Sequence, residues 1–236
     1  MGLSSAFATT RWSIVEAATS DDADARQFAL NEFARCYQMP CEAWLRSRGL
    51  SFDRAEEVVQ NFMVEVVLHR GLLGTAQRGQ GALRRLVLHA LRNHATDLAR
   101  RGVARDRHEA VAAEGADAAT SDSDPAFDMP WARAQLQEAV ERVRRRSMGG
   151  RHEPAWRAFE KRVLMPAVYG TREPTQEEVA RSVGLADAAR AAVLVREMRV
   201  RVLRALEEVV SETARNPADV EAELAHVRAC LGGPVQ

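Results

Sequence analysis

The stretch from Ser51 to Arg101 constrains the fold more than any other part of the 236-residue chain. It reads SFDRAEEVVQNFMVEVVLHR, then GLLGTAQRGQG, then ALRRLVLHALRNHATDLARR. Apolar residues recur every three or four positions in the first and last segments, which is the period of an amphipathic helix. Four glycines between them predict a loop. The segments therefore predict two consecutive helices, the first with an acidic, amide-bearing face and the second with an arginine-bearing face.

Helical periodicity extends over most of the remaining chain. Residues 24–48 form a further helical pattern, in which Pro40 predicts a break or a kink. The pattern resumes over Trp131–Arg146 and over Pro154–Val168, and Gly149-Gly150 separates these two segments. Since no segment shows the alternation of a strand, we expect an all-α fold.

A change of composition divides the chain. The segment EAVAAEGADAATSDSDPAF, after Arg107, is poor in large apolar residues and rich in Ala, Asp and Ser, as in flexible acidic linkers. We therefore expect two small helical domains, at residues 1–105 and 129–236, joined by a linker at 106–128. Each domain is long enough to bury a modest core.

The second domain contains the most readable local motif, PTQEEVARSVGLADAARAAVLVREMRVRVL. Thr175 followed by Glu178 is a capping box that opens a short helix. Gly184 predicts a tight turn, and a longer helix with arginines begins near Asp187. This pattern predicts a helix-turn-helix, whose second helix enters the DNA major groove, although a helical hairpin in a bundle has the same local signature.

Charge is segregated along a chain whose formal net charge is zero. Arginines gather in residues 78–107, 142–151 and 190–204, whereas acids gather in residues 21–24, 56–65 and 109–128. Arginine clusters suit phosphate contacts, so nucleic acid is an expected partner. Acidic and amide side chains on one helix face suit a basic protein partner.

Several function classes lack any signature. No apolar run approaches the ~18 residues of a membrane span, and the N-terminus lacks the pattern of a secretory signal. The three cysteines form no C-x-x-C pair, and the histidines show no metal-ligand spacing. Neither a nucleophile motif nor a phosphate-binding loop occurs. We therefore expect a cytoplasmic protein without metal, cofactor, membrane contact or enzymatic activity.

From Thr10 to Leu231 the chain resembles the extracytoplasmic-function sigma factors, small bacterial transcription initiation factors. RAEEVVQNFMVEVV is similar to the family's D-A-E-D-x-x-Q-x-x-F helix. ALRRLVLHALRNHATDLARR is similar to its F-R-x-W-L-x-x-I-A-R-N-x-x-x-D-x-x-R-R helix. The resemblance implies a region-2-like domain at residues 1–105 and a region-4-like domain at residues 129–236. It also implies a protein that directs core RNA polymerase to promoters by recognising −10 and −35 elements.

Specific residues take their expected roles from this resemblance. Those expected to bind core RNA polymerase are Glu56, Glu57, Gln60 and Asn61. Those expected at the −10 element, on the melted non-template strand and the adjoining double-stranded promoter DNA, are Gln77, Arg78, Gln80, Arg84, Arg85, Arg92, Asn93, Arg100 and Arg101. Those expected at the −35 element are Arg190, Arg196 and Arg199. An anti-sigma factor is a further possible partner, on another chain.

Two departures from the family keep an alternative open. Leu83 and Leu86 occupy positions where members often have Phe and Trp, which reduces base stacking. Alanines stand where members often have base-reading side chains, at positions 188, 189, 191 and 192. The alternative is a regulatory or decoy protein that binds polymerase and no longer initiates transcription. A tail beyond Ser211 predicts one more short helix, opened by Asn216-Pro217, that either packs on the helix-turn-helix or regulates it.

Overall fold

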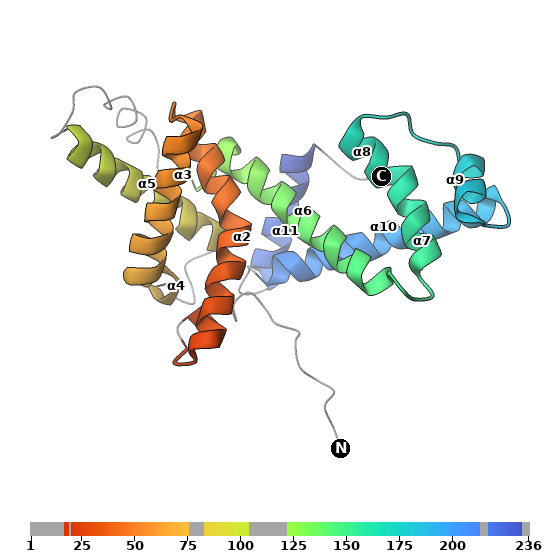
Figure 1. The fold of residues 1–236 in the computed structure, drawn as a ribbon, viewed down its shortest axis with the longest axis horizontal. Helices are drawn as coiled ribbons and strands as arrows, with labels where there is room; N and C mark the ends of the chain where they lie inside the picture. The colour runs from red at the N-terminus through yellow and green to blue at the C-terminus, as the bar shows by residue number, and fades with distance from the viewer. Residues whose placement is uncertain (1–16, 19, 76–82, 104–121, 213–216, 233–236) are drawn as a thin grey trace, which may run out of the picture. The chain divides into compact units, whose positions relative to one another are not determined.

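The computed structural model describes residues 17–18, 20–75, 83–103, 122–212 and 217–232. These ranges contain helices and no strands, so the predicted all-α class is confirmed (Figure 1). The chain forms two compact units, one made of residues 1–135 with 210–236 and the other of residues 136–209. Their bounds differ from the predicted domain bounds, because the C-terminal tail belongs to the same unit as the N-terminal helices.

The first unit is built mainly from helices of the N-terminal half. Its elements are α2 (Ala23–Ser47), α3 (Phe52–Phe62), the π-helical turn η1 (Met63–His69), α4 (Leu72–Thr75), α5 (Leu83–Val103), the first part of α6 (Pro125–Ser147) and α11 (Pro217–Leu231). Helices α2, α3 and α5 contact one another, and Figure 1 shows α2 beside α3. The residues of α11 confirm that the tail contains a helix opening at Pro217.

Helix α2 continues through Pro40, so of the predicted break or kink, the break is wrong at that position. Proline removes one backbone hydrogen bond from a helix. Burial of the surrounding side chains offsets that loss, since Tyr37, Cys41 and Trp44 are each at most 3% exposed. Packing therefore keeps this segment as one helix, although local propensity alone would divide it at Pro40.

Helix α3 packs as its sequence periodicity predicts, and Ser51 caps its start. The Ser51 hydroxyl oxygen accepts a hydrogen bond from the Arg54 backbone N–H at 3.3 Å, which is an N-cap. Ala55, Val58, Val59 and Phe62 are buried. The polar residues between them consequently lie on the outer face of the helix.

His94 of α5 lies inside the core of the first unit. Its ring is 5.7 Å from the Phe62 ring, and its Nε2 is buried with no hydrogen-bond partner within the described structure. Burial and the nearby positive charge of Arg70 lower the pKa of this histidine. Both causes disfavour the protonated ring, so the fold favours neutral His94.

A pH dependence of stability follows from His94. In the unfolded chain, His94 takes up a proton as the pH falls below its ordinary pKa of about 6.5. In the folded chain, His94 binds that proton only at lower pH, so protonation favours unfolding. We expect the free energy of unfolding to fall between about pH 6.5 and pH 5, and to fall less in a His94→Leu variant. Urea denaturation at the two pH values measures this difference. An equal loss in both proteins would assign the pH dependence to other groups.

The second unit contains the remaining residues of α6, followed by α7 (Glu153–Phe159), η3 (Glu160–Leu164), α8 (Met165–Tyr169), α9 (Gln176–Val183) and α10 (Ala188–Ser211) as far as Val209. Trp156 and Phe159 are buried, with ring centroids 5.7 Å apart. These aromatic rings anchor α7 to the interior of this unit.

The local signals predicted around α9 are present in the structure. Thr175 and Glu178 form both hydrogen bonds of a capping box. Gly184 ends the helix with a φ of 73°, in the left-handed region where a side chain is strained. Asp187 then accepts a hydrogen bond from the Arg190 backbone N–H at 2.7 Å, at the start of α10. Two capped helices with a glycine turn between them are the result.

Across the described ranges, the structure contains no helix with both the length and the apolar character needed to cross a bilayer.

Candidate functional site

Helix α3 presents its predicted polymerase-binding residues on one side. Glu57, Gln60 and Asn61 are exposed, and Glu56 is partly buried. The Glu57 carboxylate pairs with Arg54 at 2.6 Å, and Gln60 Nε2 donates to Glu56 Oε1 at 3.3 Å. These contacts join neighbours on the helix surface and leave much of the carboxylate and amide surface open to a partner.

Two apolar side chains extend this face beyond the predicted residues. Val64 and Leu68 of η1 are 48% and 47% exposed, whereas Val66 and Val67 are buried. The spacing of four residues places Val64 and Leu68 on one side of the turn. Sequence periodicity did not single them out, because both belong to an apolar run in which inward and outward positions look alike.

The residues predicted at the −10 element occupy three different environments. Arg85, Asn93, Arg100 and Arg101 are exposed on α5. Arg92 is partly buried, and Arg84 is buried with 3% exposure. Residues 77, 78 and 80, where Gln77, Arg78 and Gln80 were predicted to meet DNA, lie outside the described residues.

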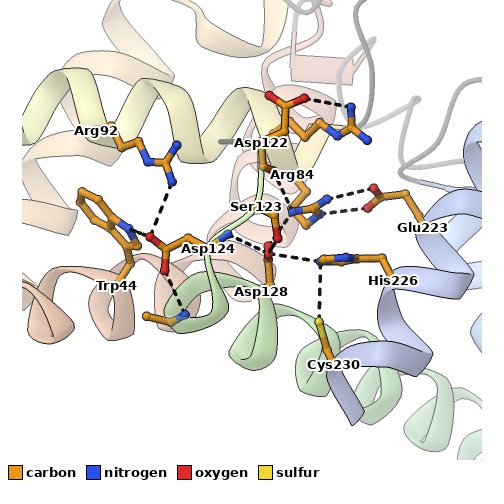
Figure 2. A network of polar contacts seen from close by, with 12 residues as sticks. Trp44, Arg84, Arg92, Asp122, Ser123, Asp124, Asp128, Glu223, His226 and Cys230 are labelled. Atoms are coloured by element: carbon orange, nitrogen blue, oxygen red, sulfur yellow. Dashed lines mark hydrogen bonds and ion pairs between the residues drawn. The ribbon is translucent and has the colours of Figure 1, made fainter. Parts of the chain in front are cut away.

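Arg84 is enclosed by acceptors from two other segments of the first unit (Figure 2). Its Nη1 donates to Asp128 Oδ1 at 2.5 Å and to the Asp122 carbonyl oxygen at 3.3 Å. Its Nε and Nη2 donate to the two carboxylate oxygens of Glu223 at 3.1 and 3.2 Å. The guanidinium also lies 5.4 Å from the Trp131 ring centroid. Arg84 thus has two carboxylate partners and one aromatic face.

The charge of Arg84 is stabilised where it is buried. Burial by itself lowers the pKa of the guanidinium, but hydrogen bonds and charge from Glu223 and Asp128 outweigh it and raise the pKa above its ordinary value. A bidentate pair with a carboxylate is the strongest geometry open to an arginine. The prediction that Arg84 contacts DNA does not fit this arrangement, because its donors face carboxylates inside the protein.

Asp128 joins three segments of the first unit. Besides Arg84, its carboxylate accepts from Ser123 Oγ at 2.5 Å and from the Asp124 backbone N–H at 2.9 Å. His226 Nε2 of α11 lies 3.2 Å from its Oδ2. Asp128 is 1% exposed, so these donors compensate for its lost hydration. It ties the start of α6 to both α5 and α11.

Asp124 forms a second junction, between α2, α5 and α6. Its Oδ2 accepts from Trp44 Nε1 at 2.9 Å and from Arg48 Nη2 at 2.6 Å, and lies 3.5 Å from Arg92 Nη2. Burial by itself raises the pKa of Asp124, but hydrogen bonds from Trp44, the Ala126 backbone N–H and Arg48, together with the Arg48 charge, reverse that effect and lower it. The carboxylate is therefore charged at neutral pH.

The sequence contained a signal for these buried acids. Asp124, Phe127, Asp128, Trp131 and Gln135 follow one another at helical spacing, and all five are buried. An acid that recurs on an apolar face predicts a buried charge with a partner. The partners themselves lie far away in the chain and carry no local signal.

The residues predicted at the −35 element lie at the start and middle of α10. Arg190 and Arg196 are exposed, and Arg199 is partly buried. Of the four alanines at neighbouring positions, Ala191 is fully buried. Packing inside the second unit therefore gives a structural reason for a small apolar residue at this position.

Cys230, His226 and Asp128 bring together a thiol, an imidazole and a carboxylate. Cys230 Sγ lies 3.6 Å from His226 Nε2, the same nitrogen that faces Asp128. A nucleophile relay uses the two ring nitrogens separately, one for the nucleophile and one for the acid. Burial, followed by the nearby Asp128 charge, raises the pKa of the Cys230 thiol. This geometry does not activate the sulfur.

Within the described parts of the chain, no three His, Cys, Asp or Glu side chains form a group suited to a metal ion. No protein-family model matches the chain, and neither a curated protein nor a solved structure matches it.

Proposed function

We propose that this chain is a transcription initiation factor of the extracytoplasmic-function sigma type, which binds core RNA polymerase and directs it to promoters. One observation carries the proposal beyond the sequence resemblance. The exposed acidic and amide face of α3 and the exposed arginines of α5 belong to one compact unit. A protein that joins a polymerase to DNA needs these two surfaces on one rigid support.

The polymerase contact is assigned to α3 and η1. Glu57, Gln60 and Asn61 supply acceptors and amides for a basic partner helix, and charge complementarity directs association with it. Val64 and Leu68 add an apolar strip that loses water when the partner docks. A mixed strip of this kind suits a helical partner better than a small ligand.

The −10 contact is assigned to the exposed residues of α5. Arg85, Arg100 and Arg101 can neutralise phosphates, and Asn93 can hydrogen-bond to a base edge. In the second unit, α9, the Gly184 turn and α10 act as a helix-turn-helix at the −35 element. Arg190, Arg196 and Arg199 are the contacts proposed there.

Copurification followed by run-off transcription tests this function. The full chain is mixed with core RNA polymerase, passed over a sizing column, and then supplied with matched and scrambled promoters. Binding to polymerase and initiation from matched promoters alone are the expected results. A chain that never binds polymerase would contradict the proposal.

The same experiment separates a second candidate, a regulatory or decoy protein that occupies polymerase without initiating. One observation favours it: Arg84, Arg85 and Arg92 all pair with carboxylates of the same chain. Polymerase binding without initiation at any promoter would support this candidate over a sigma factor.

Replacing both arginines at the end of α5 tests its DNA contact. Arg100→Ala with Arg101→Ala should weaken DNA binding and lower the slope of log affinity against log salt by about 2, because each lost phosphate contact releases about one counterion less. Fluorescence anisotropy over a salt series measures the slope. An unchanged slope would mean that the two arginines only stabilise the C-terminal end of the helix.

A further inference from the structure

The three paired arginines of α5 share one type of partner. Arg84 pairs with Asp128 and Glu223, Arg85 pairs with Asp122 at 3.2 Å, and Arg92 lies 3.5 Å from Asp124. Asp122 and Asp124 come from the segment that leads into α6, Asp128 from the first turn of α6, and Glu223 from α11. We call them the acidic clasp: Asp122, Asp124, Asp128 and Glu223 (Figure 2).

We propose that the acidic clasp occupies the DNA-binding side of α5 and competes with promoter DNA for its arginines. The proposal rests on the proposed function in one respect, that α5 meets DNA. A carboxylate and a phosphate use the same guanidinium donors, and both prefer the bidentate geometry. An arginine that donates to the clasp is therefore not free to donate to a phosphate.

The acidic clasp has a buried part, at Arg84, and an exposed part, at Arg85. At Arg84, the guanidinium and both of its carboxylates are at most 3% exposed, so no phosphate can approach without displacing α11. Between Arg85 and Asp122 the side chains are 43% and 71% exposed, and water screens their attraction. The expected order of release starts with Asp122 and ends with Glu223.

Helix α11 is the element that closes the clasp. Glu223 supplies both carboxylate oxygens to Arg84, and His226 from the next turn contacts Asp128. Both side chains point from α11 toward the start of α5 and α6 (Figure 2). Both roles predicted for the tail concerned the helix-turn-helix. The contacts of Glu223 and His226 are with α5 and the start of α6, so the regulation proposed here is of the α5 surface.

Two double variants with the same change in net charge test the clasp. Asp122→Asn with Glu223→Gln removes one charge from each part of it. Asp21→Asn with Glu221→Gln is the control variant. It removes two exposed charges that do not belong to the acidic clasp, and Glu221 lies on α11 as Glu223 does. The probe is a fluorescein-labelled duplex with a single-stranded bubble, and fluorescence anisotropy at low salt measures its affinity for the full-length chain.

The clasp variant should bind the probe about five- to tenfold more tightly than the wild-type chain, with a steeper salt dependence. The control variant should change affinity by less than about twofold, since dispersed charges are screened. Equal gains in both variants, or a gain in neither, would overturn the proposal. Asp122→Asn alone changes only an exposed residue and should give a smaller gain in affinity. This single variant keeps the test valid if Glu223→Gln unfolds the chain.

These results are separable from those for the proposed function, because the anisotropy measurement contains no polymerase. A wild-type chain that does not bind polymerase would overturn the sigma function, while tighter DNA binding by the clasp variant would still support the clasp. Conversely, normal initiation together with unchanged affinity in the clasp variant would overturn the clasp alone.

Discussion

Arg84→Met should destabilise the chain by about 3–5 kcal/mol, because it removes the shared partner of two buried carboxylates. Asp128 and Glu223 have side chains 1% and 3% exposed, so neither can regain its hydration without moving. Methionine keeps an apolar stem against Trp131, which confines most of the change to charge. Urea denaturation at neutral pH, followed by circular dichroism, measures the loss.

Arg85→Met is the matched control for this prediction. It removes the same charge one position along α5, from a pair that is exposed on both sides. The expected loss is under about 1 kcal/mol, as for other surface ion pairs. A similar small loss in both variants would mean that Arg84 is not held in the buried network, and would return it to the set of DNA contacts.

Adding Glu223→Leu to Arg84→Met should restore part of the lost stability. The double variant has one buried carboxylate that lacks its arginine in place of two, and Asp128 keeps its contacts with Ser123, Asp124 and His226. Buried ion pairs are often replaceable by apolar groups of similar volume. The partial recovery shows that the loss comes from unpaired charge. No recovery would instead assign the loss to packing around Trp131.

Glu57→Arg should reduce the affinity for core RNA polymerase by at least about a hundredfold, since it replaces an attraction with a repulsion at the centre of the proposed interface. Glu57 is exposed and pairs only with a neighbour one turn away, Arg54, among the contacts of α3 described above. Thermal stability should therefore change little, by less than about 1 kcal/mol. Biolayer interferometry with immobilised polymerase measures the affinity.

Glu207→Arg is the control for this variant. It makes the same charge reversal at an exposed position of α10, in the second unit. Its polymerase affinity should stay within about threefold of wild type if only dispersed charge changes. Equal losses in both variants would point to net charge and not to the face of α3. A large drop in the melting temperature of Glu57→Arg would mean that Glu57 is structural.

The sequence predicted the helices well where local interactions decide them. The Thr175–Glu178 capping box and the Gly184 turn depend on residues at most a few positions apart. Such contacts form within one helical turn, so their signals survive in the linear sequence. The same holds for the polar face of α3, since helical spacing alone separates Glu57, Gln60 and Asn61 from the buried valines.

The burial of Arg84 could not be predicted from the sequence. As a sequence position it belongs with Arg85, and the two were expected to have the same role. In the structure one is buried and the other is exposed, because Glu223, 139 residues away, and Asp128 converge on the first. Only packing of distant segments decides such a difference, and no local pattern in α5 carries it.

The sequence by itself thus determined the all-α class, the capping box and glycine turn around α9, and the polar face of α3. Tertiary structure alone decided that α2 passes through Pro40, that α11 joins the N-terminal unit, and that carboxylates occupy three arginines of α5. The physical reason is the range of the interactions. Helix periodicity and capping act over three to four residues, whereas burial and ion pairing depend on which segments fold against one another.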